Sequence, residues 1–375
     1  MMTYMWRSLE LSSARAAWPD LHGGGLKSER VLWPDLIRVF ATVCVVVIHV
    51  SAVPATHLPQ VGRPAWDYAV IYDALSRTAV PLFIMTSGAL LLAGSTAKVG
   101  AFAWRRFGKV GIPLLVWSAA YFVWRIVIRN EPLTVSDCVY HLLHGFTDPI
   151  YPHLWFLYAI LILYTLIPLL AFALRRLSPR LLLGLVLMWA IIETTEFSAS
   201  QGASAFIGFD LLSLAGCVGY FIAGYALARA LPAKLRHFQL GICICVFMAA
   251  AAAASIGTIF SSSRGEGRLN EQLLAPLAPD VLVMSISAFV LLRHLSTYLG
   301  PGPHARLARF ATISFGVYLI HPMAIDVLDI LGLHLDPLSC NSIWYIPLIS
   351  GLVLLMSAGC IYMLRLSRLT RWVVP

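Results

Sequence analysis

The sequence predicts an all-α polytopic membrane protein with about ten transmembrane helices and both termini in the cytoplasm. Three observations support this fold class. First, 59% of the 375 residues are hydrophobic, only 12% are charged, and the mean hydropathy is +0.80, which is unlike an ordinary soluble domain. Second, apolar runs of membrane-spanning length recur along the chain. Third, the basic residues gather in alternate connections between these runs.

The expected helices cover nearly all of the chain after a polar N-terminal segment. Residues 1–30 contain no apolar run of the length of a secretory signal, and we expect them to form a cytoplasmic tail before one transmembrane domain, residues 31–375. The runs lie at about 32–53, 68–92, 107–128, 154–174, 181–196, 206–228, 238–260, 277–297, 311–332 and 343–364. Between the third and fourth runs, SDCVYHLLHGF is a short amphipathic segment, typical of a helix at the membrane interface.

The positive charges predict the orientation of these helices. With a cytoplasmic N-terminus, all but six of the 27 lysines and arginines fall in inner segments. The six on the outer side are Arg63, Arg77, Arg125, Arg129, Arg264 and Arg268. This asymmetry follows the positive-inside rule and favours an even number of helices. The net charge of +9 therefore indicates membrane topology, and no nucleic acid partner is expected.

The first apolar run, Leu32–Val53, carries three ionisable residues, Asp35, Arg38 and His49. Arg38 and His49 are eleven residues apart, so in a helix they differ by roughly 20° in azimuth and roughly 16 Å in depth. Burying an arginine in a spanning helix costs on the order of 2.5–3.5 kcal/mol, so such residues usually face the protein interior and have a function. The alternative is an Arg38 that reaches the membrane surface and a His49 that only fills the core. Their shared face favours a functional pair.

A basic segment, WRRFGKV, opens the third helix. Its Arg105, Arg106 and Lys109, together with Arg38, would place several cations at one inner site. Guanidinium groups bind phosphates through two hydrogen bonds, so a phosphate-bearing cofactor suits this site. The same cations would also serve topology alone. The position of Arg38 inside an apolar run favours phosphate binding.

A second group of residues is expected near the outer surface. Asp73 and Arg77 have the spacing of an ion pair on one helix, and His153 and Trp155 open the fourth helix. Carboxylates, cations and a tryptophan around one opening suit a hydroxyl-rich or anionic sugar. Ordinary interfacial residues of an aromatic belt are the alternative for each of them.

Two prolines predict local distortions. In the ninth helix, His321 precedes Pro322, and we expect its ring to bond a carbonyl that the proline leaves free; this structural role competes with a catalytic one. The segment AVPLFIMTSGALLL in the second helix joins a proline to small residues, which predicts a kink and close helix packing. The sequence shows no nucleophile elbow, Walker loop or HExxH motif, and its seven cysteines lack metal-ligand spacing, so no metal is expected.

Four stretches together resemble the integral membrane acyltransferase-3 family. They are DLIRVFATVCVVVIHV, VPLFIMTSGALLL, HLWFLYAILILYTLIPLL and SFGVYLIHP. The resemblance implies transfer of an acyl group, usually acetyl from cytosolic acetyl-CoA, to a hydroxyl of a bacterial surface or secreted glycan or of its lipid-linked precursor. It places the protein in the bacterial inner membrane. Arg38 and His49 match the essential pair of the family.

The resemblance is to the stand-alone branch that includes the enterobacterial common antigen O-acetyltransferase. The family tends to carry an R-x-x-R pattern at the third helix, taken to contact CoA, whereas here Lys109 replaces the second arginine after Arg106. The charge is kept and the planar fork is lost.

The residues suggest a mechanism and leave alternatives open. Arg38, oriented by Asp35, would hold the donor, while His49 acts as general base or carries the acetyl group itself. A polysaccharide or small-molecule transporter is the main competing class, and a sensor or scaffold without turnover is a third. A carrier would more often show internal inverted repeats, and none is visible in the sequence.

Overall fold

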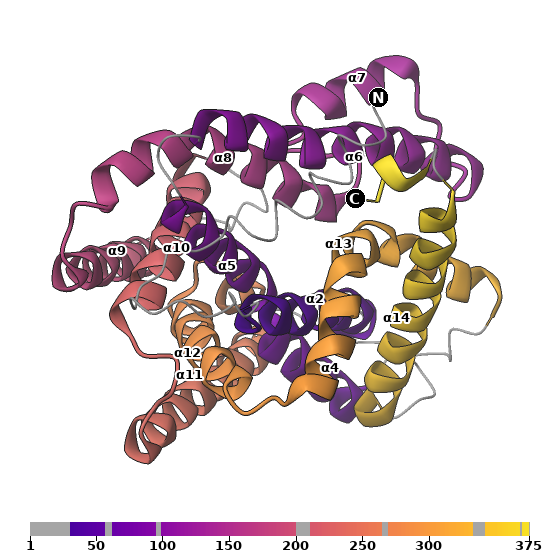
Figure 1. Cartoon of the computed structure of the whole chain (residues 1–375). Coiled ribbons are helices and arrows are strands. Elements are labelled where there is room, and N and C mark those ends of the chain that lie inside the picture. Colours follow the sequence, from indigo (N-terminus) through magenta and orange to yellow (C-terminus); the bar gives the residue numbers. More distant parts are fainter. Residues whose placement is uncertain are drawn as a thin grey trace.

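A computed structural model describes residues 31–56, 62–94, 99–199, 211–264, 269–332, 342–367 and 370–374, and the expected tail, residues 1–30, lies outside this set. Every regular element in the described residues is helical, which confirms the all-α fold class (Figure 1). The long helices are α2 (Trp33–Ala55), α4 (Arg63–Ser76), α5 (Ala79–Ala93), α6 (Val99–Val127), α8 (Trp155–Leu174), α9 (Pro179–Ala199), α10 (Leu211–Ala230), α11 (His237–Arg264), α12 (Pro279–Ser296), α13 (Pro301–Ile330) and α14 (Ser342–Leu366).

Each of the ten predicted apolar runs overlaps a helix of the structure. Among the described residues, nine spans are long and apolar enough to cross a membrane, with α4 and α5 together forming one of them. Helix α10, the counterpart of the predicted run 206–228, is not among the nine. Its glycines, tyrosines and Arg229 reduce its hydropathy, and its description begins only at Leu211.

The second predicted helix is broken in two. Helix α4 ends at Ser76 and α5 begins at Ala79. The proline ring of Pro81 clashes with the carbonyl group four residues earlier, which belongs to Arg77, and Pro81 has no N–H to bond it. The break therefore falls where the proline requires it, as the sequence predicted.

Helix α2 lies at the centre of the molecule. It packs against α4, α5, α12, α13 and α14, which surround it in Figure 1. Ile37, Ala41, Val46 and Val50 on α2 are fully buried. Ionisable side chains on this helix therefore meet other helices, so the tertiary structure gives them neighbours that the sequence does not reveal.

Helices α5 and α10 cross at very short distance. A Cβ atom added at Gly88 of α5 would lie 1.9 Å from the carbonyl oxygen of Phe221, and one added at Gly224 of α10 would lie 1.9 Å from that of Met85. Only glycine permits this backbone contact, in the manner of small-residue interfaces between membrane helices. The close packing predicted for α5 is confirmed.

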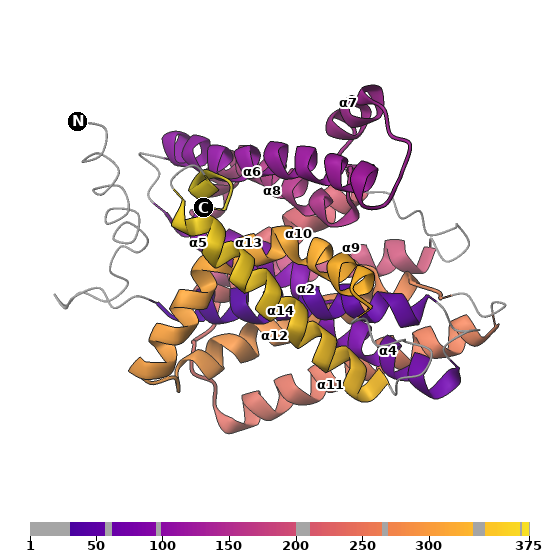
Figure 2. The ribbon, with the colours of Figure 1, turned by 90° about the vertical axis from the view of Figure 1, so that its right-hand side faces the viewer.

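Helices α6 and α8 pack together as a layer beside the central helix (Figures 1 and 2). The predicted amphipathic segment forms α7 (Val135–Leu143), which Figure 2 shows at the edge of this layer. Its first turn has a capping box, in which the Thr134 side chain and the Asp137 backbone N–H are paired. The exposed Val135 and Leu143 suit a helix at a membrane interface, which stays a prediction.

Candidate functional site

Three histidine rings converge beside the central helix. His49 comes from α2, His321 from α13, and His153 from the short 3₁₀ turn Pro152–Leu154 before α8. The ring centre of His49 lies 4.9 Å from that of His321 and 6.4 Å from that of His153, and the latter two are 5.4 Å apart. His153 and His321 are buried, and His49 is partly exposed. The sequence analysis assigned these residues to separate roles, and the fold brings them together.

A hydrogen bond to the backbone of α13 fixes the orientation of the His321 ring. Pro322 has no N–H, so the carbonyl group of Tyr318, four residues earlier, lacks its usual helical donor. The Nδ1 atom of His321 lies 2.7 Å from this carbonyl oxygen. A carbonyl only accepts, so Nδ1 carries the proton and Nε2 is the basic nitrogen. The predicted bond to a freed carbonyl is confirmed.

The His153 ring is enclosed by tyrosines. The rings of Tyr121, Tyr151 and Tyr318 lie 5.0, 5.5 and 5.4 Å from it, centre to centre. The Tyr318 hydroxyl donates to the His153 carbonyl, and the Tyr121 hydroxyl donates to the Leu319 carbonyl at 2.7 Å. These bonds attach the start of α8 and the middle of α6 to α13. Within the described residues, neither ring nitrogen of His153 has a hydrogen-bond partner.

The sequence analysis missed these tyrosines. Their signal was weak, because aromatic residues are common in apolar helices. Tyr318 and His321 do share a helix face at a spacing of three residues, which a search for polar groups on α13 would have found.

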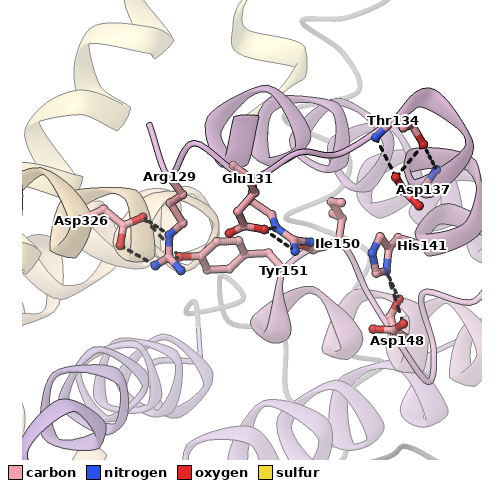
Figure 3. Close-up of polar contacts among 10 residues, drawn as sticks. Arg129, Glu131, Thr134, Asp137, His141, Asp148, Ile150, Tyr151 and Asp326 are labelled. Carbon is pink, nitrogen blue, oxygen red and sulfur yellow. Dashed lines mark hydrogen bonds and ion pairs between the residues drawn. The ribbon is translucent and has the colours of Figure 1, made fainter. Parts of the chain in front are cut away.

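A network of hydrogen bonds and an ion pair surrounds Asp326, further along α13 than His321. Asp326 is five residues after His321, roughly 7.5 Å along the helix. Figure 3 shows Arg129 and Tyr151 meeting this carboxylate. Arg129 donates to Asp326 from Nη2 at 2.8 Å and from Nε at 3.3 Å, and the Tyr151 hydroxyl donates at 3.3 Å. The Nε1 of Trp124 adds a fourth bond, at 2.8 Å. The end of α6 and the segment before α8 are thereby fastened to α13.

Tyr151 connects this network to the histidines. Its ring stacks on Tyr121 at 4.3 Å, and its hydroxyl accepts a bond from Arg129 at 2.9 Å. Burial, together with the charge of Asp326, raises the pKa of Tyr151 to about 12. The hydrogen bond to Asp326 likewise raises the pKa of Arg129. Tyr151 therefore stays a protonated donor and Arg129 a cation at every physiological pH.

The Asp35 and Arg38 side chains lie near the beginning of α2. Arg38 Nη1 is 3.8 Å from Asp35 Oδ1, and the Arg38 side chain is 36% exposed. The Asp35 carboxylate therefore lies beside the guanidinium, and its orienting role stays a prediction. Arg105 and Arg106 belong to α6, but their side chains lie outside the described residues, and Lys109 is exposed on the same helix. A basic site formed by all four cations stays a prediction.

The predicted ion pair between Asp73 and Arg77 is present. Arg77 donates to the carboxylate twice, from Nε at 2.7 Å and from Nη2 at 2.6 Å. The side chains are 1% and 19% exposed, so the pair is largely buried at the break between α4 and α5. Its place at an outer acceptor opening stays a prediction. Trp155 opens α8 and contacts Phe156 edge to face.

In the described part of the chain, no group of three or more histidine, cysteine, aspartate or glutamate side chains is arranged to hold a metal ion. The chemistry available at the convergence of α2, α8 and α13 is that of imidazoles, which can act as general bases and as nucleophiles towards acyl carbons.

Comparison with known proteins gives one match. Searches of the curated proteins and of the solved structures found none. The sequence pattern of a family described as an acyltransferase domain matches residues 31–364, which include α2 with Arg38 and His49, the start of α8 and the whole of α13. The chain therefore belongs to the acyltransferase-3 family of membrane proteins.

Proposed function

We propose that this membrane acyltransferase moves an acetyl group from cytosolic acetyl-CoA to a hydroxyl of a bacterial surface or secreted glycan, or of its lipid-linked precursor. The multi-pass protein would act in the bacterial inner membrane. One observation carries the proposal: the helix that bears Arg38 near its beginning brings His49, about 16 Å further along, against His321 and His153. A cation for the donor and a base for the acceptor thus share one central helix.

On the donor side, Arg38 would contact the phosphates of acetyl-CoA. The neighbouring carboxylate of Asp35, 3.8 Å away, would restrict the guanidinium and so lower the entropy lost on binding. Arg105, Arg106 and Lys109 at the beginning of α6 would hold the nucleotide. The pantetheine arm is narrow enough to pass between helices, and it would carry the thioester towards His49.

At the acceptor, His49 would act as general base. Its imidazole takes the proton of the sugar hydroxyl while the oxygen attacks the thioester carbonyl carbon. The carbon–sulfur bond then breaks, and the imidazolium returns the proton to the CoA thiolate. A covalent acetyl-histidine at the same ring is the second route, and it would appear as label on the protein.

The experiment uses the purified protein in liposomes with acetyl-CoA labelled in the acetyl group. Release of free CoA thiol is followed together with transfer of label to a neutral oligosaccharide added outside. We expect thiol release that rises with oligosaccharide concentration, and ester-linked label that mild alkali removes. Oligosaccharide that crosses the bilayer without any thiol release would instead show a transporter and overturn the proposal.

Replacing Arg38 tests the donor side separately. A hydrogen bond to a charged group contributes about 1.5–3 kcal/mol, so we expect Arg38→Ala to raise KM for acetyl-CoA about 10- to 100-fold with a smaller effect on kcat. Arg38→Lys keeps the positive charge but loses the planar guanidinium that binds a phosphate through two hydrogen bonds. Its KM should therefore lie between those of the wild-type protein and of Arg38→Ala. Arg180→Ala, at an exposed position near the start of α9, is the matched control and should not change KM. An unchanged KM in Arg38→Ala would remove Arg38 from the donor site.

A further inference from the structure

The hydrogen bonding of His321 gives this ring a defined direction. Its Nδ1–H donates to the carbonyl oxygen of Tyr318 at 2.7 Å, a carbonyl that is free only because Pro322 follows. The proton of the neutral ring is thereby held on Nδ1. The backbone of α13 thus presents Nε2 as an acceptor that has no proton of its own.

That acceptor lies inside the protein. His321 is fully buried, and within the described residues its Nε2 has no hydrogen-bond partner. A buried acceptor without a hydrogen-bond partner is unfavourable, so a partner during turnover would be favourable. The candidates are the two other imidazoles of the cluster.

His49 fits this position better than His153. The ring centre of His49 is 4.9 Å from that of His321, whereas the ring centre of His153 is 5.4 Å from it, so His49 is the nearer neighbour. His49 is also the one residue of the three that is partly exposed, and it lies on the helix that bears Arg38.

We propose that His321 is a positioning residue whose Nε2 accepts a hydrogen bond from the ring N–H of His49. This bond selects the His49 tautomer and leaves the opposite nitrogen of His49 free to take the hydroxyl proton. The inference rests on the proposed function for that last step. When His49 becomes an imidazolium, one N–H stays bonded to His321 and the other proton passes to the CoA thiolate. His321 keeps its own proton on Nδ1 throughout, so it gains and loses none.

Two substitutions separate this role from a purely structural one. In His321→Asn, the side-chain amide N–H can take the position of Nδ1–H and keep the bond to the Tyr318 carbonyl. The shorter asparagine side chain has no atom at the position of Nε2. In His321→Gln, the longer side chain places its amide oxygen near Nε2 and gives up the bond to Tyr318. A positioning role therefore predicts a higher rate for the Gln variant, and a structural role predicts a higher rate for the Asn variant.

The measurement is kcat and KM for acetyl-CoA in the full-length protein, with thermal unfolding in detergent recorded for each variant. We expect kcat of His321→Gln to be at least tenfold above that of His321→Asn, with similar KM in both. Equal kcat values, or a higher value for His321→Asn, would overturn the proposal. Because the two variants are compared with each other, a general loss of stability cannot produce the expected order.

A second measurement does not depend on turnover. In protein labelled with nitrogen-15 in its histidine rings, the signals lost in His321→Gln identify His321. We expect a protonated Nδ1 and an unprotonated Nε2, and a shift of the Nε2 signal in His49→Ala, which removes its donor. An unchanged Nε2 signal would overturn the proposal. Failure of thiol release in the wild-type protein would instead refute the acetyl-CoA reaction.

Discussion

His49→Ala is expected to abolish acyl transfer. A positioned general base contributes about 10²- to 10⁴-fold to the rate, and the alanine variant loses that contribution together with any covalent route through the same ring. Release of CoA thiol in the presence of oligosaccharide should therefore fall by at least a hundredfold. KM for acetyl-CoA should change little, because the proposed donor contacts lie about 16 Å away at Arg38.

The control is His237→Ala. His237 is exposed at the beginning of α11, so its removal should leave both the rate and the folding unchanged. His49 is only partly buried, so His49→Ala should also fold. A His49→Ala variant with more than a tenth of the wild-type rate would show that another group is the base.

Gly88→Ala is expected to cause the largest loss of stability. The added Cβ would lie 1.9 Å from the carbonyl oxygen of Phe221, which belongs to the backbone of α10 and cannot rotate away. Overpacking of a core costs about 1–3 kcal/mol, and we expect the upper end because two helices must move apart. The thermal unfolding midpoint in detergent should fall, with activity lost in parallel, since α5 also packs against α2 and α8.

Gly184→Ala is the matched control for this prediction. Gly184 lies in α9, where an added Cβ would meet nothing within 4 Å. Alanine has a higher helix propensity than glycine by about 1 kcal/mol, so this variant should be as stable as the wild-type protein or slightly more stable. If Gly88→Ala unfolds at the same temperature as Gly184→Ala, the close contact between α5 and α10 does not contribute to stability.

The network around Asp326 helps to position one of the three histidines of the site. It joins the end of α6, Tyr151 and α13 through four hydrogen bonds to one carboxylate. Figure 3 shows the bonds from Arg129 and Tyr151. Tyr151 also touches His153 edge to face. The network therefore holds the start of α8 in place and keeps His153 close to His49 and His321.

Much of the fold follows from local properties of the chain. Apolar runs of spanning length must form helices, because every backbone polar group within a bilayer needs an internal partner. Proline acts on the carbonyl four residues earlier, so Pro81 predicts the break at Arg77, and Pro322 predicts the bond between His321 and Tyr318. The pair formed by Asp73 and Arg77 is also local, because its members are four residues apart on one helix.

The candidate site could be predicted only in part from the sequence. Helical geometry places Arg38 and His49 on one face of α2, and that inference needs no tertiary information. The sequence does not reveal which helices pack against this face of α2. It predicted the ion pair of Asp73 and Arg77, but only the structure shows that this pair is largely buried.

By itself, the sequence determined the membrane class, the helices, their proline distortions and the residues that share a helix face. Only the tertiary structure decided that His153 and His321 meet His49, and that Arg129 pairs with Asp326, 197 residues away. The physical reason is the range of the interactions. Helical periodicity and proline geometry act over about four residues, whereas these contacts depend on which helices pack together and at what depth.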